Sequence, residues 1–149
     1  MYKTILVPLD GSSRAECILV HVADMALRYN ADVVLLQVVS PIIPVMDPDA
    51  FLLELGLDEI KARINDAASY LDKLTDELVK KGIRVRPIVN HGSVVETIIR
   101  IAGQEAADLI AMASHGRTGL ARVFYGSVAA GVLQHIDRPL LLIRSRNDA

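Results

Sequence analysis

The stretch Ile5-Leu6-Val7-Pro8-Leu9-Asp10-Gly11-Ser12 opens the chain with a short apolar run that ends in a turn. A β-branched run of this length, closed by Pro, Asp and Gly, is typical of a buried strand. Ser13 followed by Glu16 has the spacing of a capping box, which predicts that a helix begins here. Apolar residues then recur at helical spacing over 15–26. The first third of the chain therefore begins with a βα unit.

The same alternation of strand and helix patterns continues to the end of the sequence. Four more strands are predicted, at Val33–Val39, Ile83–Val89, Asp108–Ala113 and Leu140–Ile143. Three more helices are predicted, at Asp58–Lys81 before Gly82, after a second capping box at Ser93 and Glu96, and from Gly126, where Ala129, Val132, Leu133 and Ile136 should face inward. Repeated βα units indicate an α/β fold with a buried parallel sheet.

The third strand decides the predicted strand order. It alternates apolar residues with Arg84 and Arg86 and contains Pro87, which has no N–H for a ladder, so it belongs at a sheet edge. Right-handed crossovers then favour a doubly wound sheet of order 3-2-1-4-5 with helices on both faces. In such a sheet, ligands bind in the crevice at the carboxyl ends of strands one and four.

Composition limits the classes of function. The 149 residues fit one domain, 1–149, and 52% hydrophobic with 23% charged residues is an ordinary globular composition. A net charge of −2 argues against a nucleic-acid partner. Cys17 is the only cysteine, so an intramolecular disulfide is excluded. No apolar run approaches the ~20 residues of a membrane helix, and we expect a cytoplasmic protein with no membrane partner.

The segment Met112–Val128 has the composition of a phosphate-binding loop, being rich in glycine and hydroxyl residues with two arginines and a histidine. Gly126-Ser127 at a helix start would offer unpaired amides and the positive end of a helix dipole to an anion. The segment is neither a P-loop nor the dinucleotide G-x-G-x-x-G motif. On composition alone, an ordinary glycine-rich connector is the alternative, slightly favoured over a phosphate site.

Three stretches together resemble the universal stress protein family. The family motif, Gly-x2-Gly-x9-Gly-Ser/Thr, is matched at Gly116 and at Gly126-Ser127, nine residues later, while Ala113 stands in place of its first glycine. The opening Ile5–Ser12 and the closing Arg138–Ile143 are also similar to that family, so the resemblance spans the chain. Alanine suits negative φ, so we expect the site to be retained if Ala113 is extended.

The resemblance implies a role for each matching residue in binding ATP. Asp10 would accept a hydrogen bond from the ribose, and the backbone near Val38 and Val39 would hold the adenine edge. Pro8 and Met112 would supply apolar walls. For Asp10, the alternative is a turn residue, common at strand ends.

The phosphates would meet backbone amides of the glycine-rich loop. The implied phosphate contacts are Gly116, Arg117, Ser127 and Val128, with the Ser127 hydroxyl and His115 as further donors. The loop that carries the site begins at Ala113. Any Mg²⁺ or Mn²⁺ would arrive with the nucleotide and be held mostly by water and phosphate oxygens. No catalytic group and no metal-ligating residue of the protein is assigned.

Two further segments predict association. The strand Leu140–Ile143 is wholly apolar yet would form the other edge of the sheet, where its unpaired backbone groups would be exposed. A homodimer through this edge would pair and cover it. The family resemblance points the same way. The connection 40–57 is longer than the ~12–15 residues usual for loops, so we expect it to contain a short helix that packs on the sheet, covers the nucleotide or binds a protein partner.

The sequence therefore predicts an ATP-binding regulatory module that responds to stress, with at most slow ATP hydrolysis. An enzyme of the related adenine-nucleotide hydrolases would need a further domain for its second substrate. A dimeric adaptor without nucleotide is another alternative, and a binder of cyclic AMP or AMP is a third.

Overall fold

The computed structural model describes residues 1–40, 50–114 and 126–145, and its five strands form one parallel sheet. The strands are β1 (Thr4–Leu9), β2 (Asp32–Val39), β3 (Val85–His91), β4 (Leu109–Ala113) and β5 (Leu140–Ile143). The helices are a 3₁₀ turn η1 (Ala15–Ile18), then α1 (Leu19–Tyr29), α2 (Ala50–Val79), α3 (Val94–Gln104) and α4 (Gly126–His135). The sheet order is β3-β2-β1-β4-β5, which confirms the predicted doubly wound fold.

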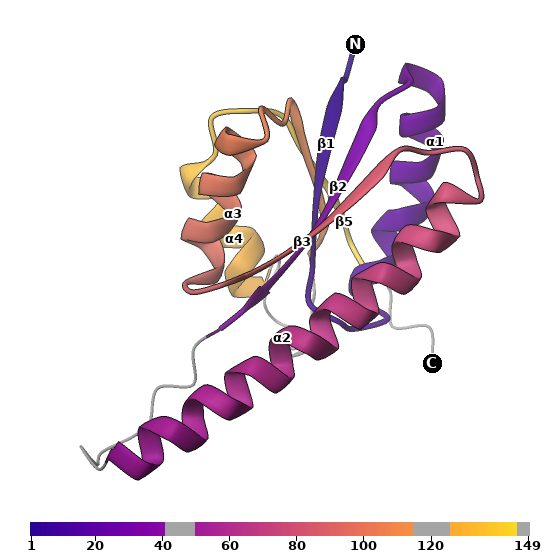
Figure 1. The fold of residues 1–149 in the computed structure, drawn as a ribbon. Helices are drawn as coiled ribbons and strands as arrows, with labels where there is room; N and C mark the ends of the chain where they lie inside the picture. Colours follow the sequence, from indigo (N-terminus) through magenta and orange to yellow (C-terminus); the bar gives the residue numbers. More distant parts are fainter. Residues whose placement is uncertain (41–49, 115–125, 146–149) are drawn as a thin grey trace.

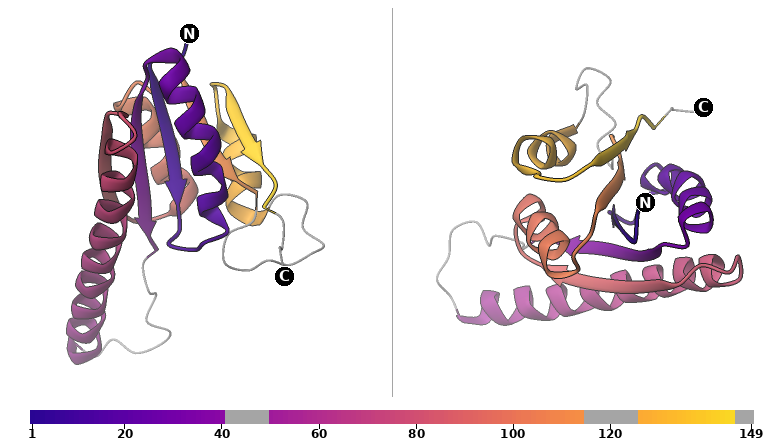
Figure 2. Two further views of the ribbon diagram at one scale, coloured as in Figure 1. Left: turned by 90° about the vertical axis from the view of Figure 1, so that its right-hand side faces the viewer. Right: turned by 90° about the horizontal axis from the view of Figure 1, so that it is seen from above.

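Helices cover both faces of the sheet, α1 and α2 on one and α3 and α4 on the other (Figures 1 and 2). Side chains alternate between these faces, because successive residues of a strand point to opposite sides. Val7 and Leu35 belong to the core under α1 and α2, whereas Leu6 and Leu36 belong to the core under α3 and α4. Burial on both faces explains why the strands read as continuous apolar runs.

At the start of the first helix, the capping box predicted at Ser13 and Glu16 is not the one that forms. The Ser12 hydroxyl, not that of Ser13, accepts a hydrogen bond from the Ala15 amide at 3.2 Å. The chain then makes the 3₁₀ turn η1 before α1 begins at Leu19. The predicted apolar face is nevertheless correct, since Ile18, Val22 and Ala26 are buried.

The helices on the other face also depart from the prediction in detail. Ser93 stands at the N-cap of α3, but its side chain makes no capping hydrogen bond. In α4, Ala129 and Val132 are buried as expected, whereas Leu133 is 49% exposed. Leu133 directly follows Val132, and neighbouring residues on a helix are about 100° apart, so with Val132 turned to the core Leu133 is turned away from it.

The connection predicted to hold a short helix instead supplies the start of a long one. Helix α2 begins at Ala50, and its first turns extend past the carboxyl ends of the strands (Figures 1 and 2). Residues 41–49 lie outside the described part of the chain. At the other end α2 stops at Val79, two residues before the predicted Lys81, and Gly82, with φ +87°, lies in the turn that terminates it.

The third strand begins two residues later than predicted. The Ile83 amide bonds the Leu78 carbonyl at 3.3 Å, so Ile83 completes the end of α2 and pairing in the sheet starts at Val85. Pro87 lies in this strand at the edge of the sheet, as expected. The opposite edge is β5, with the predicted bounds.

Candidate functional site

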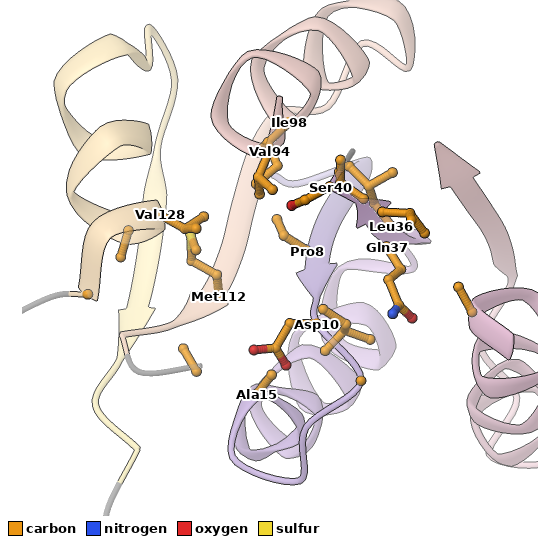
Figure 3. Close-up of a pocket in the computed structure, with 18 of the residues that line it drawn as sticks. Pro8, Asp10, Ala15, Leu36, Gln37, Ser40, Val94, Ile98, Met112 and Val128 are labelled. Carbon is orange, nitrogen blue, oxygen red and sulfur yellow. The ribbon is translucent and has the colours of Figure 1, made fainter. Parts of the chain in front are cut away.

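A cavity of about 610 Å³ opens at the carboxyl ends of β1, β2 and β4 (Figure 3). This lies within the ~300–1,000 Å³ of small-molecule sites. Its lining comes from the ends of these strands and from α2, α3 and α4. In Figure 3, Met112 and Val128 lie on one side, Gln37 and Ser40 on the other, and Pro8 and Asp10 between them.

Every predicted site residue that the structure describes lines this one cavity. These residues are Pro8, Asp10, Val38, Val39, Met112, Ala113, Gly126, Ser127 and Val128. The predicted phosphate contacts His115, Gly116 and Arg117 lie outside the described residues. Groups far apart in the sequence thus meet because the strands are parallel and all end at the same edge of the sheet.

Asp10 has the turn role that the sequence left open, and it also lines the cavity. Its Oδ1 accepts hydrogen bonds from the Ser12 amide at 2.9 Å and from the Ser12 hydroxyl at 2.6 Å. The same Ser12 oxygen accepts from the Ala15 amide. These bonds fix the loop after β1 and hold the carboxylate at the mouth of the crevice.

Gly126, where α4 begins, occupies a position that only glycine fits. Its φ is +68°, a left-handed conformation that L side chains rarely adopt. A Cβ there would lie 2.7 Å from the carbonyl oxygen of Ser114, at the end of β4. The helix start therefore packs directly on the strand end, which keeps the first amides of α4 at the cavity.

Ala113, which replaces the first glycine of the motif, is the last residue of β4. It is not among the described residues with positive φ, and its neighbour Ser114 continues the pairing by donating its amide to the Ile143 carbonyl at 2.8 Å. The extended conformation expected for a tolerated alanine is therefore the one observed.

Helix α2 contributes a wall that sequence reasoning missed. Arg63, Asp66, Ala67 and Tyr70 line the cavity. The Arg63 Nη1 donates to the Ser40 carbonyl at 2.9 Å, which ties α2 to the end of β2. The polar side of this helix reads as an ordinary solvent face, and no local signal shows that its first turns pass the strand ends.

Gln37 in β2 was also missed, and here the sequence does contain a signal. It is the one polar residue in the run Val33–Val39. Its side-chain oxygen Oε1 is buried without a hydrogen-bond partner among the described residues, as is the Oγ of Ser114. Both residues line the cavity, and Ser114 is only 4% exposed. Buried polar atoms are almost always paired, so such atoms at a cavity suggest ligand contacts.

Tyr70 is the residue of the α2 wall whose pKa is shifted. Burial is the main cause that raises its pKa, and the nearby carboxylates of Glu16 and Asp10 raise it further. The phenol therefore stays protonated at neutral pH and can act as a hydrogen-bond donor on this side of the cavity.

Metal-binding clusters and membrane-spanning helices are both absent from the described ranges 1–40, 50–114 and 126–145. No group of three or more His, Cys, Asp or Glu side chains is arranged to hold a metal ion there. None of the helices in these ranges has the length and apolar character needed to cross a membrane.

Fold and cavity together define the class: a doubly wound α/β protein with its crevice at the switch point between β1 and β4, where proteins of this architecture bind ligands. Residues 1–144 match the Universal stress protein family. The chain belongs to that family.

Similar proteins agree with this assignment. The Universal stress protein MJ0577 of Methanocaldococcus jannaschii is 32% identical over 159 residues, covering 99% of this chain and 98% of the relative. The solved structure of MJ0577 superposes with a TM-score of 0.87, 30% identity and 99% coverage of both chains.

Two more distant structures share the fold and were solved with nucleotides. One is a universal stress protein in complex with cAMP, with a TM-score of 0.63, 20% identity and coverage of 97% of this chain and 98% of that one. The other is a universal stress protein family protein from Arabidopsis thaliana with AMP bound, with a TM-score of 0.66, 16% identity and coverage of 98% and 94%.

Proposed function

We propose that this protein is a cytoplasmic regulatory module, formed by one domain over residues 1–149, that binds ATP in the cavity at the carboxyl end of its sheet. The ribose would bond Asp10, the adenine edge would meet the backbone at Val38 and Val39, and the phosphates would lie at Gly126 and Ser127. The predicted contacts of His115, Gly116 and Arg117 would complete the phosphate end. Binding would then alter the association with protein partners.

The observation that carries the proposal is the convergence of β1, β2, β4 and α4 on one cavity. Polar groups suited to a nucleotide alternate there with apolar walls from Pro8 and Met112. Gly126 packs closely on the Ser114 carbonyl, and Gly126, Ser127 and Val128 at the start of α4 line the cavity. Amides at a helix start favour an anion. The residues present therefore fit an adenine nucleotide.

Two measurements test the proposal. Mass spectrometry of small molecules released from the freshly purified protein should detect ATP, and titration calorimetry of the emptied protein should give a micromolar Kd, or about −8 kcal/mol. Phosphate release over hours would measure slow hydrolysis. If no nucleotide is released and ATP gives no heat, the nucleotide module is wrong, and a dimeric adaptor without nucleotide becomes the better account.

Another adenine nucleotide is the second candidate. The structures of family members with cAMP and with AMP favour it, because the ribose and adenine contacts would be shared. Titrations with cyclic AMP and AMP under the same conditions decide the preference. A divalent ion, Mg²⁺ or Mn²⁺, would tighten ATP more than AMP if it binds through the phosphates.

The apolar edge strand β5 supports a homodimer within this proposal. In the described part of the sheet β5 pairs only with β4, and its four residues are all half-buried. The carbonyls of Pro139 and Ile143 accept bonds from β4, so the alternate residues Leu140 and Leu142 direct their backbone groups to the open edge.

Leu142→Pro tests the dimer without touching the pairing with β4. Proline would remove an amide that faces the open edge, which an edge strand tolerates, and the substituted chain should sediment as a monomer while retaining its helical circular dichroism. A dimer of unchanged affinity would contradict the role of β5 as the interface.

A further inference from the structure

The order of the strands in the sheet indicates where the phosphates, the ribose and the base of a bound nucleotide would lie. Gly126 and Ser127, proposed for the phosphates, adjoin the end of β4, and Asp10, proposed for the ribose, follows β1. Strand β2 lies on the far side of β1 from β4. Neighbouring strands are about 4.8 Å apart, so the end of β2 is roughly 10 Å from the phosphate end. A nucleotide laid across the crevice thus places its base at β2.

Gln37 is the polar side chain that β2 presents at this end. In the sheet it lies between Leu9 of β1 and Val89 of β3, and its side chain is on the same face as Leu35, toward α2. The amide is drawn at the edge of the cavity in Figure 3. Its side chain therefore lies on the α2 face of the sheet, at the cavity.

Gln37 lines this end of the cavity, and its Oε1 is buried and has no partner among the described residues. A buried acceptor without a donor is costly, and a ligand N–H that reaches it restores the lost hydrogen bond. Arg63, which also lines the cavity, donates to the Ser40 carbonyl. The amide oxygen of Gln37 is thus a buried side-chain acceptor at the base end, beside the backbone of Val38 and Val39.

We propose that Gln37 determines base specificity, with its amide oxygen accepting a hydrogen bond from the exocyclic amine of an amino-purine. The inference rests on the proposed nucleotide function. A carboxamide matches the edge of adenine, since it accepts from the 6-amino group and donates to the adjacent ring nitrogen. With the amide in the orientation of the structure, a 6-oxo-purine would place its oxygen against the amide oxygen and leave both acceptors unpaired, so the site would disfavour it.

The test compares ATP with inosine triphosphate (ITP), which differs at the purine 6-position, in calorimetric titrations of the full chain. We expect the wild type to favour ATP by at least about tenfold. Gln37→Met, of similar length but without the amide group, should lower ATP affinity about tenfold. Its affinities for ATP and ITP should then differ by less than about threefold. Gln104→Met, an exposed glutamine at the far end of α3, is the matched control and should keep the wild-type ratio.

A second variant separates specificity from folding. Gln37→Glu keeps an acceptor oxygen but cannot donate, so it should still favour ATP over ITP even if its stability falls. An unchanged ratio in Gln37→Met, or equal binding of both nucleotides by the wild type, would overturn the role of Gln37 while leaving the nucleotide function intact. A wild type that binds neither nucleotide would overturn both.

Discussion

The two ends of the sheet use polar groups in different ways. At the amino end, polar side chains bond backbone groups of neighbouring elements: Asp108 accepts from the Lys3 amide at 2.8 Å and the Thr4 amide at 3.2 Å. At the carboxyl end some polar groups are paired, as Asp10 is with Ser12, but the side-chain oxygens of Gln37 and Ser114 are buried without a partner among the described residues. Paired groups hold the fold together, whereas unpaired groups around a cavity are suited to a ligand.

Arg138 is the clearest example of a paired polar side chain at the amino end of the sheet. Its Nη1 donates to the carbonyls of Ala102 at 2.8 Å and Ala107 at 2.7 Å, and its Nε bonds Asp137. It thus joins the segment before β5 to the turn between α3 and β4. At the carboxyl end, around Gly126, tight backbone packing against Ser114 sets the geometry instead.

The largest effect is expected from Arg138→Met. The substitution leaves two carbonyls without their charged donor and should lower the free energy of unfolding by about 2–3 kcal/mol, measured by urea denaturation. ATP affinity should stay within about twofold, because the cavity lies at the opposite end of the sheet.

The matched control is Arg100→Met. Arg100 is exposed on α3 and bonds the Gln104 side chain at 3.4 Å, so its loss should cost less than about 0.5 kcal/mol. A large loss of ATP affinity in Arg138→Met would show that the two ends are not independent.

Gly126→Ala is the corresponding change at the carboxyl end. The new Cβ would meet the Ser114 oxygen and the residue would keep an unfavourable φ, so the start of α4 must move away from β4. We expect ATP affinity to fall at least about tenfold, or about 1.4 kcal/mol, with a stability loss of about 1–2 kcal/mol.

Gly103→Ala is the control for this substitution. Gly103 lies in α3, and a Cβ added there would meet no described atom within 4 Å, so alanine should stabilise the helix by about 0.5–1 kcal/mol and leave binding unchanged. Unaltered ATP affinity in Gly126→Ala would place the phosphates elsewhere.

Asp10→Ala should have the smallest of the three effects. It removes the proposed ribose acceptor and the bonds to Ser12, and we expect ATP and AMP to weaken by a similar factor of about tenfold in calorimetry. Asp24→Ala, which breaks an exposed ion pair with Arg28, should change neither affinity. Loss of ATP binding with AMP unaffected would argue against a ribose contact.

Much of the fold was predictable because its signals are local. The apolar runs placed all five strands, with β5 at its observed bounds, and Pro87 placed β3 at the edge. The errors also have local causes. Ser13 and Glu16 have capping-box spacing, but the Ala15 amide donates to the Ser12 hydroxyl instead. Helix α2 starts earlier than the pattern of polar residues indicated.

The cavity was predictable only in part. The sequence by itself determined the strand ends and the glycine at the start of α4, because turns, prolines and glycines restrict the backbone wherever they occur. Only the tertiary structure decided that α2 forms a wall with Arg63 and Tyr70, and that the Gln37 oxygen is buried without a partner among the described residues. Those features depend on how far a helix reaches past the sheet and on what packs over a side chain, and contacts between distant segments set both.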